Sequence, residues 1–194
     1  MSILRIYNCF HPILREKAQK VEEFDQELKD FTDSMLETMY NADGIGLAAN
    51  QVGDRRSIFT VDINTGSDDK ADYTPIVMIN PEIKSFSEEV STFQEGCLSI
   101  PKYYEDVVRP ESIQISYTDV DMKVKTIEAS EILSRVVQHE YDHLKGILFF
   151  DRITQLKKTL GKKKLNKIKK GEMTTFYPMI NADGSNFDPN EQKQ

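Results

Sequence analysis

The chain has 194 residues, of which 39% are hydrophobic and 29% charged, and its formal net charge is −7 at pH 7. These values indicate one globular domain with at most a tail, and they exclude a globally disordered chain. No stretch approaches the roughly 18 apolar residues that a membrane helix needs, and the N-terminus lacks the apolar core of a signal peptide. We therefore expect a cytoplasmic protein with no membrane partner.

The first half of the chain is predicted to hold one helix and two strands. Apolar residues recur every three or four positions over residues 24–40, which predicts a helix. Residues 56–63 and 75–79 are rich in β-branched and apolar side chains and are predicted to be strands. We expect Asn80 and Pro81 to end the second strand, because this dipeptide is a turn signal.

The second half is predicted to hold a hairpin and a central helix. Apolar and polar residues alternate over residues 113–117 and 120–124, which predicts a hairpin that turns near Asp119. Farther along the chain, apolar residues and two histidines share one face at spacings of four, three and four. They predict a helix with Ser130 as its N-cap and Gly146 as its stop signal.

A third helix is predicted over residues 154–170, and it is strongly basic. We expect it to pack through an apolar stripe made of Leu156, Leu160, Leu165 and Ile168. Residues 152–171 carry +9, which leaves −16 for the rest, because the whole chain carries −7. Such a segment suggests a polyanionic partner, but an ordinary solvated helix face is the commoner explanation of a charge run.

The predicted central helix carries the sequence His139-Glu140-Tyr141-Asp142-His143. Residues four apart lie on one face of a helix, so His139 and His143 are able to grip one metal ion. Glu140 is offset from them by one position and would act on water as a general base rather than as a ligand. The alternative is a chance match, since the pattern fixes only three positions.

A catalytic metal site needs a third protein ligand and one open position. Phe149 stands where one group of metalloproteases has a third histidine, and the first glutamate downstream, Glu172, lies beyond the basic helix. Cys97 is the remaining candidate, and with His139 and His143 it would form a site of one sulfur and two nitrogens. A buried structural thiol is the alternative for Cys97.

A glycine-rich segment, Gly44-Ile45-Gly46-Leu47-Ala48-Ala49-Asn50-Gln51, precedes these residues. It does not fit a dinucleotide-binding loop, because a helix precedes it rather than a strand and Ala49 occupies the third glycine position. Glycines and small residues instead allow the backbone to approach a ligand closely. Gln51 would supply an amide N–H to a developing oxyanion, whereas an ordinary turn with a solvated glutamine is the alternative.

These elements predict an α+β fold in which short antiparallel strands pack around a central metal-binding helix, with a C-terminal helical extension. We divide the chain into a catalytic metallo-hydrolase domain at residues 1–153, a basic helical extension at 154–171 and a polar, partly disordered tail at 172–194. From residue 181 on, where Asn, Asp, Gly and Pro are frequent, we expect no regular structure.

Three motifs of the chain resemble those of the peptide deformylase family. The family has Gly-apolar-Gly-apolar-Ala-Ala-x-Gln, Glu-Gly-Cys-Leu-Ser and Gln-His-Glu-x-Asp-His-Leu-x-Gly, in this order. Residues 44–51, 95–99 and 138–146 match them without a mismatch, and the resemblance extends over about residues 3–153. Arg109 occupies a position that the family often gives to arginine, in a structural or peptide-contacting role.

This resemblance implies an activity and a set of residue roles. The family removes the N-formyl group from the initiator methionine of nascent polypeptides and releases formate. In the implied site, one ion per chain is held by Cys97, His139 and His143. That ion is Fe²⁺, with Zn²⁺ or Ni²⁺ able to substitute. Glu140 is the implied general base and later protonates the leaving amine, while the Gln51 side chain and the Leu98 backbone N–H stabilise the tetrahedral oxyanion.

The implied partner is a formyl-methionyl nascent peptide, whose methionine side chain needs an apolar pocket. Ile132 and Val136 lie seven and three residues before the first histidine, on its helix face, and would line that pocket. Ile45 would join them, with Gly44 and Gly46 beside it. Core packing is the alternative for the three apolar residues. The basic helix suggests contact with the ribosome surface.

Two other classes of protein share parts of this pattern. A metalloprotease has the same two histidines and glutamate, but the chain offers it no obvious third ligand other than Cys97. Cleavage of an internal peptide bond, as opposed to formate release, would identify it. A catalytically silent ribosome-binding protein would fit the basic helix, but the intact metal ligands and Glu140 count against it.

Overall fold

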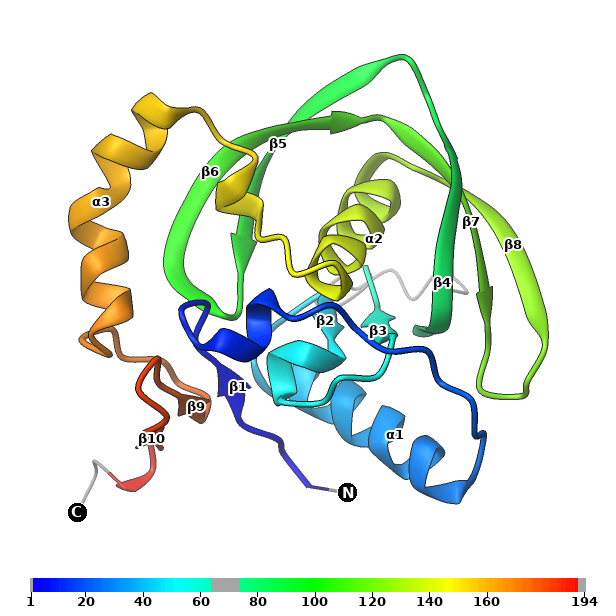
Figure 1. The fold of residues 1–194 in the computed structure, drawn as a ribbon, viewed down its shortest axis with the longest axis horizontal. Helices are drawn as coiled ribbons and strands as arrows, with labels where there is room; N and C mark the ends of the chain where they lie inside the picture. The colour runs from blue at the N-terminus through cyan, green and yellow to red at the C-terminus, as the bar shows by residue number, and fades with distance from the viewer. Residues whose placement is uncertain (1, 64–73, 192–194) are drawn as a thin grey trace.

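The computed structural model describes residues 2–63 and 74–191, and it has the α+β architecture that the sequence predicts (Figure 1). One helix, α2 (Glu131–Leu144), lies at the centre, while α1 (Gln26–Asn41) and α3 (Gln155–Lys169) lie at the periphery. A five-stranded sheet has the order β2-β3-β4-β7-β8, a two-stranded sheet is formed by β5 and β6, and a three-stranded sheet, β1-β9-β10, joins the two ends of the chain. The strands are β1 (Ile6–Tyr7), β2 (Gly46–Ala48), β3 (Ile58–Val61), β4 (Ile76–Phe86), β5 (Val90–Cys97), β6 (Ile100–Pro110), β7 (Ser112–Thr118), β8 (Val124–Ser130), β9 (Met179–Ile180) and β10 (Asn186–Phe187). None of the helices in these residues combines the length and the apolarity needed to cross a membrane.

Helix α2 is the centre of the fold, and its limits confirm the prediction. Ser130 has an extended backbone at the N-cap position, and Gly146, with φ +72°, follows the C-cap. Ten of its residues are buried, among them both histidines and the glutamate. Val136 and Val137 join a core cluster with residues of the five-stranded sheet. The polar groups of α2 therefore lie inside the protein, where each needs a partner.

The strand predicted over residues 75–79 is longer than expected, because β4 continues to Phe86. The prediction that Asn80 and Pro81 end it is wrong, since a bulge accommodates them. Asn80 adopts a left-handed backbone with φ +51°, and the register with β7 shifts there. The Asn80 side chain accepts one hydrogen bond from the backbone of Val21 and donates another to it, both at 2.8 Å, which fixes the bulge.

The hairpin predicted near Asp119 exists, but its second strand begins later than expected. Residues 119–123 form the turn between β7 and β8, so the strand predicted over residues 120–124 is wrong. The Asp119 carboxylate accepts hydrogen bonds from the backbone N–H groups of Asp121 and Lys123, both at 2.9 Å. These local bonds stabilise a turn in a segment whose alternating pattern predicts a strand.

The hairpin of β5 and β6 is absent from the predicted elements, although it carries Cys97 at the end of its first strand. Many side chains of β5 are exposed or only partly buried, so the apolar pattern that would reveal the strand is weak.

The start of the glycine-rich segment, expected to be a loop, forms β2. The strand expected over residues 56–63 is shortened to β3.

Helix α3 confirms the helix predicted over residues 154–170 but not its packing stripe. Leu156 and Leu160 are 70% and 75% exposed, so their predicted packing is wrong. Ile168 is buried and Leu165 partly buried in a cluster with residues of β6. At about 100° per residue, Leu156 and Leu160 lie about 120° and 80° around the helix from Ile168. The apolar packing of the helix therefore comes from Leu165 and Ile168.

The segment after α3 is attached to the body of the protein. Where no regular structure is predicted, β10 pairs with β9, and β9 runs parallel to β1. Tyr177 and Met179 are buried, and the side-chain amide of Asn8 donates to the carbonyl of Ile168 at 2.8 Å. The division of the chain at residues 153 and 171 stays a prediction, but these contacts connect all three parts.

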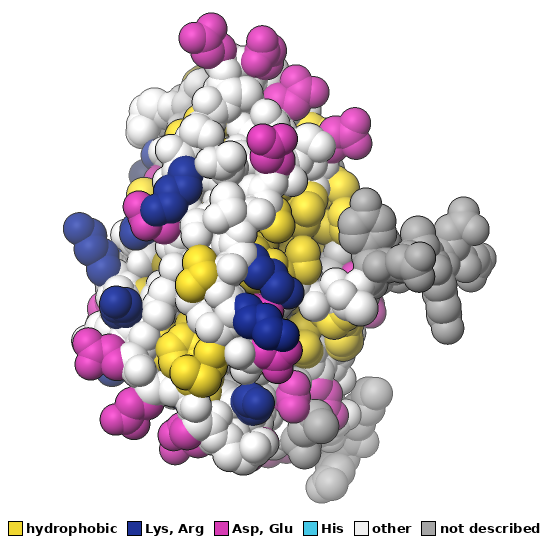
Figure 2. All heavy atoms as spheres, turned by 90° about the vertical axis from the view of Figure 1, so that its right-hand side faces the viewer, with side chains coloured by type: hydrophobic (Ala, Val, Ile, Leu, Met, Phe, Trp, Pro, Cys, Tyr) yellow, Lys and Arg dark blue, Asp and Glu magenta, His cyan; other side chains and the backbone are white. Residues whose placement is uncertain are grey.

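Positive charge is concentrated on α3, at one side of the molecule (Figure 1). Its exposed lysines include Lys162, Lys163, Lys164 and Lys167. Figure 2 shows a face on the other side, where acidic side chains gather along the upper edge. The charge asymmetry of the sequence is thus also an asymmetry of the surface.

Candidate active site

Cys97, His139 and His143 converge where the end of β5 meets α2. Their ligand atoms lie within 4.8 Å of one another, and Cys97 Sγ is 3.3 Å from His143 Nε2. Sulfur and nitrogen ligands of one tetrahedral ion are separated by roughly 3–4 Å, so this group fits a single ion. Burial, together with the neighbouring His139, lowers the pKa of His143 and keeps its imidazole in the neutral form that binds metals.

His139 is oriented by Glu95, which lies two positions before Cys97 on β5. Nδ1 of His139 is 2.9 Å from Glu95 Oε2, which leaves Nε2 for the metal group. Burial alone would raise the pKa of Glu95, but hydrogen bonds from His139 and Arg109 outweigh it and hold that pKa well below its usual range. Glu95 is therefore a carboxylate that fixes the ring of a metal ligand.

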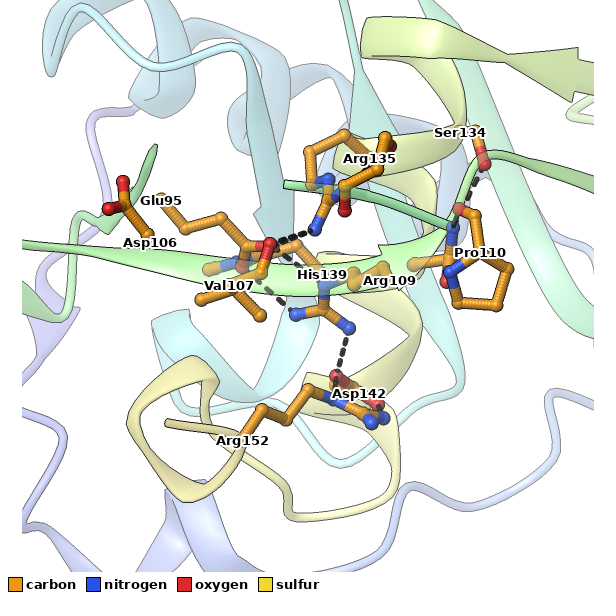
Figure 3. Close-up of polar contacts among 12 residues, drawn as sticks. Glu95, Asp106, Val107, Arg109, Pro110, Ser134, Arg135, His139, Asp142 and Arg152 are labelled. Atoms are coloured by element: carbon orange, nitrogen blue, oxygen red, sulfur yellow. Dashed lines mark hydrogen bonds and ion pairs between the residues drawn. The ribbon is translucent and has the colours of Figure 1, made fainter. Parts of the chain in front are cut away.

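Two arginines surround Glu95 and complete a network of buried charges (Figure 3). Arg109 donates to both Glu95 oxygens, at 2.7 and 2.9 Å, and to Asp142 of α2 at 2.5 Å. Arg135 donates to Glu95 at 2.9 Å, and Arg152 pairs with Asp142. Arg109 is only 2% exposed, which favours the structural role among the two expected for it. Because each charge meets an opposite one, the network holds β5, β6 and α2 together.

Glu140 lies beside the metal group, and the small size of Gly46 makes room for it. Glu140 is buried, and this burial raises its pKa to about 7. Such a pKa suits a group that accepts and returns a proton near neutral pH. A Cβ atom at position 46 would meet Glu140 Oε1 at 2.5 Å. Within the part of the chain that the structure describes, Glu140 Oε2 has no hydrogen-bond partner, so it is free to meet water or substrate.

Gln51 and Leu98 are held next to Cys97. The side-chain oxygen Oε1 of Gln51 accepts a hydrogen bond from the backbone N–H of Ala48 at 2.8 Å. The side-chain nitrogen Nε2 of Gln51 lies 3.5 Å from Cys97 Sγ. The carbonyl of Leu98 accepts a hydrogen bond from the hydroxyl of Tyr177 at 2.8 Å. Fixed N–H donors at such positions are what the stabilisation of an oxyanion requires.

A cleft of about 410 Å³ opens beside these groups. Every predicted site residue lines it except His143, which contacts Cys97 instead. Ile45 and Ile132 are 36% and 40% exposed, so they belong to the cleft rather than to the core, whereas Val136 belongs to both. The three apolar side chains expected to line a methionine pocket therefore all reach the cleft beside the metal group.

Two sets of residues around the site escape sequence reasoning. Glu95 and Asp142 stand inside the recognised motifs, but no local pattern reveals their arginine partners. Tyr104 and residues 174–177 line the cleft from parts of the chain without a motif. For both sets the missing information is which distant segments meet.

Comparison with known proteins identifies relatives over most of the chain. The family model for polypeptide deformylase matches residues 3–159. The peptide deformylases of Agrobacterium fabrum and Salinibacter ruber are 46% and 42% identical to the chain, over 80% and 93% of its length and 90% and 96% of their own. The structures of a plant peptide deformylase and of that from Legionella pneumophila superpose with TM-scores of 0.83 and 0.79, at 38% and 37% identity. These superpositions cover 89% and 88% of this chain and 92% and 98% of those chains.

Proposed function

The chain belongs to the polypeptide deformylase family, and on that premise we propose which of its residues perform the reaction. Its activity is peptide deformylation, the hydrolysis of the formyl amide bond of formyl-methionyl nascent peptides in protein biosynthesis. One observation carries the assignment of roles. Cys97, His139 and the buried carboxylate of Glu140 line one cleft, and His143 completes the group of potential metal ligands by its contact with Cys97.

Cys97, His139 and His143 would hold one divalent ion per chain. When bound, this ion supplies the activation of water near neutral pH and the polarisation of the formyl carbonyl. We propose Fe²⁺ as the native ion, with Zn²⁺ or Ni²⁺ able to substitute. Only the family resemblance supports the choice of Fe²⁺. The ligand set by itself would bind Zn²⁺ more tightly than Fe²⁺.

The choice of metal is tested on protein purified without air. Elemental analysis should find one ion per chain, predominantly iron. Activity of the Fe²⁺ form should decay in air faster than that of a Ni²⁺ form, because only the iron oxidises readily. Equal lifetimes of the two forms would contradict oxidation of iron as the cause of the loss.

Glu140 is the general base and acid of the proposed mechanism. It accepts a proton from the attacking water as the water oxygen bonds to the formyl carbon, and then delivers a proton to the leaving amine as the C–N bond breaks. The products are formate and a peptide with a free amino terminus. The raised pKa of Glu140, a consequence of its burial, supports both transfers near neutral pH.

The oxyanion and the methionine side chain are bound by the groups around the cleft. The Gln51 side-chain amide and the Leu98 backbone N–H would donate hydrogen bonds to the developing oxyanion. The methionine side chain would lie between Ile45, Ile132 and Val136. The glycines at positions 44 and 46 keep the backbone close to it.

The experiment that tests these roles is a formate-release assay on formyl-Met-Ala-Ser with Glu140→Ala. We expect unchanged metal content and a rate roughly 10²–10⁴-fold lower, which is the usual contribution of positioned proton transfer. Glu128→Ala, at an exposed carboxylate on β8, serves as the control. A Glu140→Ala rate above half that of the wild type would contradict the assignment, and cleavage of an internal peptide bond would indicate a protease.

We further propose that the enzyme works in the cytoplasm and that α3 contacts the ribosome surface. The support is electrostatic, since α3 bears exposed lysines on one side of an otherwise acidic protein. Ribosomal RNA presents dense phosphate, and lysines that neutralise phosphates release counterions. Such binding weakens steeply as salt concentration rises.

Co-sedimentation with ribosomes over a salt series tests this contact. The test variant replaces four exposed lysines of α3 with glutamine: Lys162, Lys163, Lys164 and Lys167. The control makes the same charge change at four exposed lysines elsewhere: Lys17, Lys20, Lys29 and Lys84. We expect the first variant to lose binding at low salt and the control to keep it, with formate release from a tripeptide unchanged in both. Equal binding by the two variants would contradict the contact through α3.

A further inference from the structure

The segment that follows α3 returns to the cleft. Thr174, Thr175, Phe176 and Tyr177 line the cleft that also contains the metal group and the methionine pocket. The match to the family model ends at residue 159, so this side of the cleft is built from residues beyond that match.

The segment is held firmly at its far end. Tyr177 is buried, and its hydroxyl donates a hydrogen bond to the carbonyl of Leu98 at 2.8 Å. The hydroxyl of Thr175 donates to the carbonyl of Tyr177 at 2.6 Å, and β9 begins two residues later with the buried Met179, paired with β1. These contacts fix the backbone on either side of Phe176 at the cleft.

Two aromatic side chains in this cleft are presented to solvent. Phe176 and Tyr104 are each 60% exposed, and both line the cleft. The Phe176 ring stands edge-on to Tyr177, with centroids 5.2 Å apart. The Tyr104 ring lies over Gly96, next to the metal ligand Cys97, so that a Cβ at position 96 would be only 2.6 Å from it. Rigid aromatic rings bury much apolar surface on binding at a low cost in conformational entropy.

The reaction requires a binding region of this kind. The formyl carbon must lie at the metal group and the methionine side chain in the pocket beside it. The rest of the peptide must therefore leave along the remaining length of the cleft. A methionine side chain fills only part of the 410 Å³ available.

On the basis of the proposed function, we propose that Phe176 and Tyr104 form a distal subsite. This subsite would bind the side chains of the residues that follow formyl-methionine. Because both groups are aromatic, the subsite favours peptides with an apolar or aromatic side chain at the second or third position. Phe176 is thus a specificity-determining residue that lies outside the three motifs.

The test compares Phe176→Ala with the wild type on four substrates: formyl-methionine amide, formyl-Met-Ala-Ala, formyl-Met-Phe-Ala and formyl-Met-Ala-Phe. We expect kcat/KM for one or both of the phenylalanine-containing peptides to fall roughly five- to tenfold, mainly through KM. For formyl-methionine amide, which does not reach the subsite, kcat/KM should stay within about twofold. Tyr104→Ala should change the same ratios in the same direction, and Phe176→Tyr should restore them.

Phe86→Ala is the matched control, because Phe86 is 56% exposed on β4 and does not line the cleft. Thermal unfolding of each variant establishes that it is folded. An equal fall for all four substrates, or no fall for any, would overturn the distal subsite while leaving the deformylase activity intact. Absence of formate release by the wild type from every formyl peptide would overturn the proposed function itself, and the subsite with it.

Discussion

The hydroxyl of Tyr177 donates a hydrogen bond to the carbonyl of Leu98 at 2.8 Å, although the two residues are 79 positions apart. Leu98 follows the proposed metal ligand Cys97 and carries the backbone N–H proposed for the oxyanion. This carbonyl lies in the peptide unit that follows that N–H, so the C-terminal segment supports the backbone of Leu98 from its other side. Without this bond, the partly buried carbonyl of Leu98 would need another partner.

Replacement of Tyr177 by phenylalanine tests this support. Loss of this partly buried hydrogen bond should lower the free energy of unfolding by about 0.5–1.5 kcal/mol, and kcat should fall because the Leu98 backbone is less well fixed. Urea unfolding and formate release measure the two effects. Tyr40→Phe is the control, since the Tyr40 hydroxyl bonds the side chain of Asp62 at 2.7 Å in an exposed position. A Tyr177→Phe variant with unchanged kcat would show that the bond serves stability alone.

The buried charge network predicts that two arginine substitutions lower the free energy of unfolding by very different amounts. Arg109→Leu leaves Glu95 and Asp142 with fewer opposite charges in a buried site, and we expect a loss of about 3–5 kcal/mol in the free energy of unfolding. Arg55→Leu removes an exposed pair with Glu16, which solvent screens, and should lower the free energy of unfolding far less. Urea unfolding of both variants provides the comparison. Equal losses would mean that the network around Glu95 does not hold β5 and α2 together.

The close approach of Gly46 to Glu140 predicts a position-specific loss of activity. An alanine Cβ at position 46 would meet Glu140 Oε1 at 2.5 Å and Val136 Cγ1 at 2.8 Å. Because β2 and α2 are both packed in the core, the carboxylate must move, and we expect kcat to fall at least about tenfold. Metal content should stay the same, because the atoms nearest to a Cβ at position 46 belong to Glu140 and Val136 and not to a proposed ligand.

Gly184→Ala is the control for this substitution. Position 184 has open space around it and lies in the C-terminal turn, so any effect comes from its left-handed backbone alone. Formate release and elemental analysis are compared for both variants. Full activity of Gly46→Ala would mean that Glu140 tolerates displacement and does not depend on this contact.

The two thiols should differ in reactivity and in their response to metal. Cys9 is 1% exposed and burial raises its pKa, so it should react with a chromogenic disulfide reagent only after unfolding. Cys97 is partly exposed and lines the cleft, so it should react in protein stripped of metal and be protected when Zn²⁺ is added.

Two variants assign the reactive thiol. Cys97→Ser should remove the fast-reacting group and weaken metal binding, because a hydroxyl is a poor substitute for a thiolate. Cys9→Ala should leave both the fast reaction and the metal content intact. The assignment of Cys97 as a ligand would be contradicted in two cases. In the first, the Cys97→Ser variant still has a fast-reacting thiol that Zn²⁺ protects. In the second, Zn²⁺ does not protect the thiol of the wild type.

Some features of the protein follow from local sequence. The limits of α2 were predictable because an N-cap serine and a stop glycine flank a helical pattern, and positions four apart on a helix share a face. That rule alone places His139 and His143 together. Small residues around position 46 similarly indicate a close approach of the backbone to another group.

Other features depend on which distant segments meet. Arg109 pairs with Glu95 and Asp142, 14 and 33 positions away, and a sequence does not state which of its many opposite charges become neighbours. The β5–β6 hairpin lacks a strong apolar pattern because it is half exposed, and the turn at Asp119 depends on hydrogen bonds that interrupt an alternating pattern. Phe176 belongs to a segment without a motif. It reaches the cleft only because Ile168, Tyr177 and Met179 bury their side chains against the body of the protein, and burial of apolar surface does not depend on separation along the chain.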